Sequence, residues 1–124
     1  MSETNTNNRE LTEHWIADWN ARDLDRIMEH YAEDVEFEAN TVIRRWNKPD
    51  GKLRGLAELR DHFRLGLELA PNLHFQIEDV FLSPSGYAVL YRRENNNRVL
   101  DVVELNSEGK ARRVKAFYLA CCFI

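Results

Sequence analysis

Several features are scarce in this sequence, and each shortage narrows what the chain can be. Its 124 residues contain two cysteines, Cys121 and Cys122, which are adjacent. Neighbouring residues of a strand point to opposite faces, and two cysteines are too few for structural zinc, so neither a mutual disulfide nor a zinc site is expected. We interpret both as small apolar residues of a protein in the reduced cytoplasm.

Long apolar runs and an excess of positive charge are also missing. No stretch of 18 apolar residues occurs in the sequence, so no membrane-spanning helix is predicted. The formal net charge of −4 disfavours nucleic acid as a partner, because phosphate backbones attract basic surfaces. Residues 1–9 are polar and lack the apolar core of a secretory signal. We expect them to form a disordered tail before a single domain at 10–124.

Metal, phosphate and nucleophile motifs do not occur either. None of the four histidines has a carboxylate partner at a metal-ligand spacing such as HExxH, and there is no glycine-rich phosphate loop or GxSxG elbow. We therefore expect no metal and no other cofactor. His62 is the one histidine whose neighbour, Phe63, is expected near a pocket, and the predicted site does not include it.

Helical periodicity is present in the first half of the chain. Three segments have apolar residues at helical spacing, which predicts three helices. The first carries Trp15 and Trp19, the second follows the N-cap residue Asp23, and the third opens at Gly55 and ends before Pro71. A short alternating strand is expected at 35–39, and an irregular segment at 41–54.

Alternating segments fill the second half. Strands are expected at 73–82, 87–94, 98–105 and 110–122, and the short turns between them are typical of an antiparallel meander. Helices followed by strands indicate an α+β domain. We predict three N-terminal helices packed on one face of a curved antiparallel sheet, with a pocket between the two layers.

Four segments, in this order along the chain, resemble motifs of the NTF2-like superfamily and of its SnoaL-like branch. They are 15–25 (WIADWNARDLD), 31–37 (YAEDVEF), Arg54-Gly55 with Leu59, Arg60 and Phe63, and 105–110 (LNSEGK). The resemblance covers about residues 10–119 and implies a cone-shaped fold with a cavity, often in a homodimer. Proteins of this kind include isomerases, cyclases, dehydratases, epoxide hydrolases and non-catalytic binding domains, so the resemblance implies no single activity.

Ketosteroid isomerases of this branch use a carboxylate base, a tyrosine and a protonated carboxylic acid that donates to an oxyanion. The resemblance puts Trp15 at the position of the tyrosine, Ala39 at that of the base and Asp101 at that of the acid. Glu38 is one residue away from the base position, and a shift of one residue turns a side chain to the opposite face of a strand. One of three catalytic positions is kept, which argues against steroid isomerase activity of that type.

Asp101 is the predicted catalytic residue. It interrupts an apolar strand, where it shares a face with Val99 and Val103. If that face lines the cavity, loss of solvent raises the pKa of the carboxyl and suits it to act as a general acid or base. Tyr118, on the last strand, is predicted to support it as a catalytic hydrogen-bond donor, with Trp15 as the alternative donor. The rival interpretations are an Asp101 that faces solvent or pairs with an arginine, and a Tyr118 that only fills the core.

Aromatic residues supply the predicted walls of the cavity. The predicted substrate-binding residues are Trp15, Trp19, Phe37, Trp46, Phe63, Phe75, Tyr91 and Val103. Ordinary core packing is the alternative for each of them, and Trp46 would form the lip of the pocket or cap the core. The adjacent arginines at 92–93 and 112–113 indicate either a solvated outer sheet face or a homodimer contact through that face.

The sequence therefore predicts a protein that binds a small apolar molecule. Apart from a stress-related protein with a vestigial pocket, it leaves two functions open. One is a cofactor-free isomerase, cyclase or lyase that applies general acid–base chemistry to an apolar carbonyl compound. The other is a non-catalytic ligand-binding or protein-interaction domain of the same fold.

Overall fold

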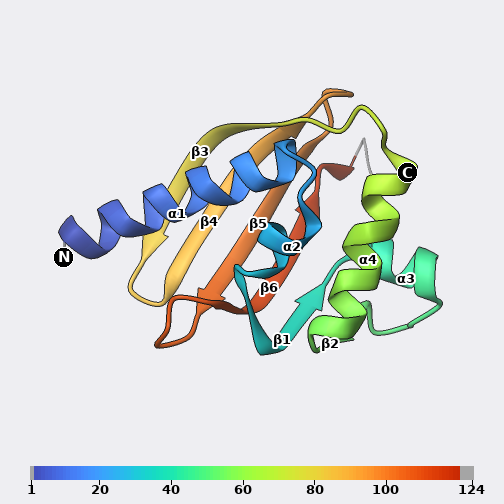
Figure 1. The fold of residues 1–124 in the computed structure, drawn as a ribbon, viewed down its shortest axis with the longest axis horizontal. Coiled ribbons are helices and arrows are strands. Elements are labelled where there is room, and N and C mark those ends of the chain that lie inside the picture. The colour runs from blue at the N-terminus through green and yellow to red at the C-terminus, as the bar shows by residue number, and fades with distance from the viewer. Residues whose placement is uncertain (1, 121–124) are drawn as a thin grey trace.

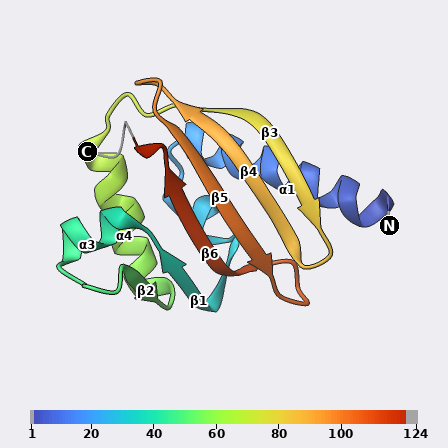
Figure 2. The same ribbon diagram turned by 180° about the vertical axis from the view of Figure 1, so that it is seen from behind.

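A computed structural model of the protein describes residues 2–120, and the two cysteines discussed above lie outside the described residues. Its helices are α1 (Ser2–Asn20), α2 (Leu24–Met28), α3 (Asn40–Trp46) and α4 (Leu56–Leu69). Its strands are β1 (Tyr31–Glu38), β2 (Lys52–Arg54), β3 (Phe75–Ser83), β4 (Gly86–Arg93), β5 (Arg98–Leu105) and β6 (Ala111–Tyr118). The helices gather on one face of a curved sheet (Figure 1), and the strands β4, β5 and β6 are uncovered from behind (Figure 2). The predicted α+β class is confirmed.

All six described strands form one sheet in the order β2-β1-β6-β5-β4-β3. The last four strands in the sequence pair with their neighbours in antiparallel fashion, as predicted for a meander. β1 joins this meander by pairing with β6 in parallel, with Phe37 opposite Val114. The first and the last described strands in the sequence are thus neighbours inside the sheet, and β2 and β3 form its two edges.

Local signals explain where the helices begin and end. The Asp23 side chain accepts a hydrogen bond from the backbone N–H of Arg26 at 3.2 Å and caps α2 as predicted. Gly55 precedes α4 with φ at +88°, a conformation that residues with a Cβ rarely adopt. The helix ends at Leu69, before Pro71, and buries Leu59 and Phe63.

The structure differs from the sequence-based elements in several places, and the last strand, expected at 110–122, ends at Tyr118. The segment 2–9, predicted as a tail, continues helix α1, because each residue added to an existing helix gains a backbone hydrogen bond. The second helix ends at Met28, since Tyr31 already pairs with Ala111 of β6. β1 is accordingly longer than the strand expected at 35–39. The segment 41–54 is not irregular: it contains α3, whose Val42 is fully buried, and strand β2.

The core lies between the helical layer and the concave face of the sheet. Its most deeply buried apolar residues are Ile27, Val35, Val42, Leu59, Val89 and Val114. Burying apolar surface of this kind stabilises the fold by about 25 cal/mol per Å². No helix among residues 2–120 is long and apolar enough to cross a membrane. The core fills only part of the space between the layers, and the rest is a cavity.

Candidate active site

A cavity of about 310 Å³ lies between helices α1, α3 and α4 and the inner face of the sheet. Six of the residues predicted to bind substrate line it: Trp15, Trp19, Phe37, Phe63, Phe75 and Tyr91. Their rings contact one another at centroid distances of 4.6 Å for Phe75–Tyr91 and 4.9 Å for Trp19–Phe63. Such packed rings form a stiff apolar wall.

The other two predicted substrate-binding residues do not line this cavity. Trp46 stands at the end of α3, where its indole N–H donates a hydrogen bond to Nδ1 of His62 at 2.9 Å. Val103 packs into the core and borders a much smaller hollow next to Tyr87. Trp46 therefore contacts His62, which lines the cavity, and does not line it itself.

Asp101 points into the cavity from the centre of β5. The strand pairs with β4 and β6 so that Asp101 lies opposite Val89 and Ala116, and only 5% of the residue is exposed. Tyr91 Oη donates to its carboxyl Oδ1 at 3.4 Å, and no described arginine or lysine forms an ion pair with it. Burial raises the pKa of Asp101 to about 7, although the hydrogen bond from Tyr91 opposes the rise. The carboxyl thus changes charge near neutral pH, which suits proton transfer.

Four tyrosines surround this carboxyl, and all keep their protons at neutral pH. Burial raises the pKa of Tyr31, Tyr87, Tyr91 and Tyr118, and the negative charge of Asp101 raises each further. Tyr31 Oη accepts a hydrogen bond from the Trp15 indole N–H at 2.9 Å. The indole N–H of Trp15 is therefore already hydrogen-bonded within the protein. Of the two predicted donors, Tyr118 is the better one.

A chain of side chains leads from α3 and α4 to Tyr118. Because the indole N–H of Trp46 is only a donor, Nδ1 of His62 must be an acceptor. Burial lowers the pKa of His62 to about 4, with the charge of Arg45 as a second cause, so the ring is neutral and its proton sits on Nε2. Nε2 lies 3.4 Å from Thr41 Oγ1, which lies 3.4 Å from Tyr118 Oη. Thr41 and Tyr118 are both hydroxyl groups, so either can be the donor in their contact.

His62 and Thr41 were missed by the sequence analysis. His62 follows Leu59 by three residues and so falls on the buried face of α4, a spacing that was available in the sequence. Thr41 lies on α3, a helix that the sequence analysis did not predict. Both are buried and line the cavity.

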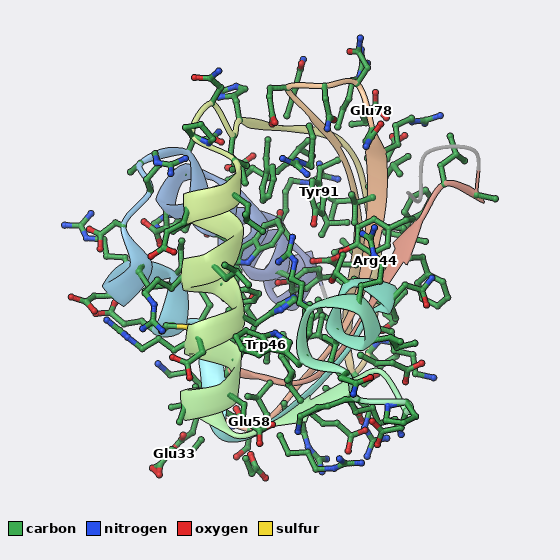
Figure 3. All side chains as sticks on the ribbon, turned by 90° about the vertical axis from the view of Figure 1, so that its right-hand side faces the viewer. Glu33, Arg44, Trp46, Glu58, Glu78 and Tyr91 are labelled. Carbon is green, nitrogen blue, oxygen red and sulfur yellow. The ribbon has the colours of Figure 1, made fainter. Side chains whose placement is uncertain are left out.

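The mouth of the cavity is basic, although the whole chain carries a net charge of −4. It is lined by Arg44 and Arg45 from α3, by Arg93 from the end of β4, and by Asn95 and Asn97. Figure 3 shows Arg44 and Tyr91 between α4 and the strands, whereas Glu33 and Glu58 lie at the lower end and Glu78 at the outer edge of the sheet. The predicted alternation of Arg92 and Arg93 is found, since Arg92 binds Glu78 on the outside.

Among residues 2–120, no three histidine, cysteine or acidic side chains converge in a way that could hold a metal ion. The site is built instead from one carboxyl, several hydroxyl groups, a neutral imidazole and guanidinium groups at the mouth. This set can donate hydrogen bonds, exchange one proton and attract an anion.

Comparisons with known proteins agree with this architecture. The family model of the SnoaL-like domain matches residues 12–119. A SnoaL-like protein of unknown function from Burkholderia thailandensis is 28% identical, with a TM-score of 0.86 over 90% of this chain and 93% of that one. A putative isomerase of the SnoaL-like family from Agrobacterium tumefaciens is 17% identical, with a TM-score of 0.74 over 93% and 99%. The epoxide hydrolase/cyclase-like enzyme SalBIII is 20% identical, with a TM-score of 0.70 over 94% of both chains. No curated protein matched the sequence.

Proposed function

This chain belongs to the SnoaL-like family, and from that premise we propose that it is a cofactor-free isomerase, cyclase or lyase acting on a small carbonyl compound. The observation that carries the proposal is the buried carboxyl of Asp101, which faces an aromatic cavity with a pKa of about 7. A carboxyl in that range is available both as a base and as an acid at neutral pH. The similar folds of a putative isomerase and of an epoxide hydrolase/cyclase-like enzyme support the same class of chemistry.

The proposed reaction begins with the carboxylate form of Asp101. It removes a proton from the carbon next to the substrate carbonyl, and the electron pair of that C–H bond forms an enolate. The Tyr118 hydroxyl donates a hydrogen bond to the enolate oxygen, where negative charge develops. The Asp101 carboxyl then returns the proton to carbon, which restores the carboxylate. Return to a different carbon isomerises the substrate. In the lyase reaction the electron pair of the enolate instead breaks the bond to a leaving group on the β-carbon, and the Asp101 carboxyl gives its proton to that group, which restores the carboxylate.

Proton exchange tests this proposal without knowledge of the substrate. Phenylpyruvate and 2-tetralone carry acidic C–H groups beside a carbonyl, and their exchange in D2O is followed by NMR. We expect the protein to accelerate exchange of at least one compound, and Asp101→Asn to reduce that rate about a hundredfold. Asp79→Asn is the matched control, because Asp79 is exposed on β3.

The outcomes separate the two functions. Binding of both compounds without exchange would instead support a non-catalytic ligand-binding domain, a role that the aromatic cavity serves equally well. Exchange that survives in Asp101→Asn would contradict the assignment of the proton to this carboxyl. Loss of exchange in Tyr118→Phe, with Asp101 unchanged, would support the hydroxyl as the donor to the enolate.

The proposal includes a homodimer through the outer face of the sheet. Phe81, Val102 and Phe117 are 58%, 42% and 51% exposed, and the strand register places all three on this face. Arg92 and Arg98 bind Glu78 at its edge and would form a polar rim. A cytoplasmic location stays a prediction from the sequence.

A further inference from the structure

Two buried donors in the part of the chain that the structure describes have no hydrogen-bond partner, and both line the same cavity. Among the described side chains, Trp19 Nε1 and Arg93 Nε are the buried polar atoms that lack one. Buried polar atoms are almost always paired, so each unpaired atom calls for an explanation. Both are N–H groups, so the complementary ligand atoms are acceptors.

Arg45 adds a second, independent observation at the mouth of the cavity. Its guanidinium is half-buried beside Gly66 of α4, where an added Cβ would lie 3.4 Å from Nη1. No described carboxylate forms an ion pair with Arg45. Burial lowers the pKa of Arg45, and the positive charges of Arg44 and Arg93 lower it further. A partly buried cation that is repelled by its neighbours favours a bound anion.

The acidic groups near the mouth leave this positive charge only partly neutralised. Glu94 binds Nη2 of Arg93 at 2.9 Å and also accepts from the backbone of His74. The one carboxyl inside the cavity, Asp101, forms no ion pair with these arginines. An anionic group of a ligand can therefore bind at two places, the Nε–H side of Arg93 and the guanidinium of Arg45.

We propose that the ligand of this cavity is an aromatic or alicyclic carboxylate, with its anionic group held by Arg45 and Arg93 and an inner oxygen accepting from Trp19. This inference rests on the proposed function and narrows its substrate to an acid. The apolar body lies against the ring wall, which explains why the cavity combines stacked aromatics with a basic mouth. Carboxylates match the planar donor groups of arginine better than a point charge does.

The test compares ligands that differ only in charge. 2-Naphthoate and 2-naphthamide, with benzoate and benzamide as smaller probes, are titrated by calorimetry. We expect the carboxylate of a pair to bind about tenfold more tightly than its amide, the value of one charge-assisted hydrogen bond. Arg45→Gln or Arg93→Gln should remove most of this preference and leave amide affinity within about twofold.

Matched variants guard against misfolding as an explanation. Arg113→Gln, on the outer face beside Glu104, should change neither affinity. Arg45→Lys keeps the charge and should retain part of the preference, and thermal melting checks that each variant folds. In addition, the Trp19 indole N–H signal, assigned with Trp19→Phe among the three tryptophans, should move on naphthoate binding more than that of Trp46.

Each result bears on a different claim. Equal affinity of the wild-type protein for acid and amide would overturn the carboxylate inference while leaving the acid–base function in place. A preference for the acid that persists in both arginine variants would overturn the assignment to Arg45 and Arg93. Failure of every probe to bind at millimolar concentration would overturn both the inference and the small-molecule function on which it rests.

Discussion

Two buried residues, Asp101 and His62, change the stability of this protein with pH in opposite directions. The pKa of Asp101 is about 7 in the folded chain against an ordinary value of 3.8. Between these values the unfolded chain has lost the proton and the folded chain keeps it, so the contribution of Asp101 to stability falls as pH rises from about 4 to about 7. The expected slope is about 1.4 kcal/mol per pH unit.

Asp101→Asn should therefore improve stability most at and above pH 7. The amide has no charge to bury, so the gain over the wild-type protein grows between about pH 4 and 7 and then levels off. Urea unfolding at half-unit pH steps measures this gain. A loss of stability at pH 8 would mark Asp101 as half of a structural ion pair, and Asp79→Asn should show no such trend.

His62 produces the opposite slope. Its pKa falls from 6.5 to about 4 on burial, so the unfolded chain binds a proton that the folded chain does not. Stability attributable to His62 is complete above about pH 6.5 and is lost as pH falls toward 4. In the wild-type protein this rise with pH offsets the fall caused by Asp101 over much of the same range.

His62→Gln should uncover the Asp101 slope, so that the variant loses stability as pH rises from about 4.5 to 6.5. Asp101→Asn should uncover the reverse slope over the same range. The two unfolding series together measure the compensation. If both variants kept the flat profile of the wild-type protein, neither buried group would titrate as the structure indicates.

At the scale of elements, the sequence predicted strands β3 to β6 better than the segment 41–54. Strands β3 to β6 alternate in burial and are separated by turn residues, so their positions and order followed from the sequence. Helix α3 was not predicted, because its seven residues form too few turns for a periodic signal. Its role depends on packing against β2 and the cavity.

The same limit explains the candidate site. Asp101 stood out because it interrupts an apolar strand, and its inward face followed from alternation. The arginines of the mouth could not be recognised in the sequence, because one lies on an unpredicted helix and another at a strand end. They come together only in the folded chain. The hydrogen-bonded chain from Trp46 to Tyr118 joins three elements, and no local pattern encodes such a contact.

The turn between β3 and β4 depends on Gly86. A Cβ at this position would lie 1.9 Å from the backbone oxygen of Val103 on β5, and a backbone atom within a sheet cannot move aside freely. Gly86→Ala should destabilise the protein by about 2–3 kcal/mol through displacement of β4 from β5. Thermal or urea unfolding tests this, with exposed Ser85→Ala as the control. Unchanged stability would show that the sheet adjusts at little cost.

At the scale of the whole molecule, the proposed homodimer can be tested on the outer face of the sheet. A stable dimer needs roughly 1,000 Å² of buried surface, and exposed Phe117 lies opposite Leu100 on this face. Phe117→Glu should convert a dimer to a monomer in light scattering coupled to gel filtration. Leu69→Glu, exposed on the helical side, should leave the dimer intact. A monomeric wild-type protein would contradict the proposed assembly.

The parallel pairing of β1 with β6 also sets an order of events during synthesis. The ribosome releases β6, the parallel partner of β1, only after all the other described strands, so until then β1 can pair only with β2. Tyr118, at the end of β6, is the last of the proposed catalytic groups to be synthesised, and the cavity is complete only once Tyr118 is in place. A ligand of this cavity therefore binds only the folded chain that includes β6. Its binding adds to the stability of that state alone.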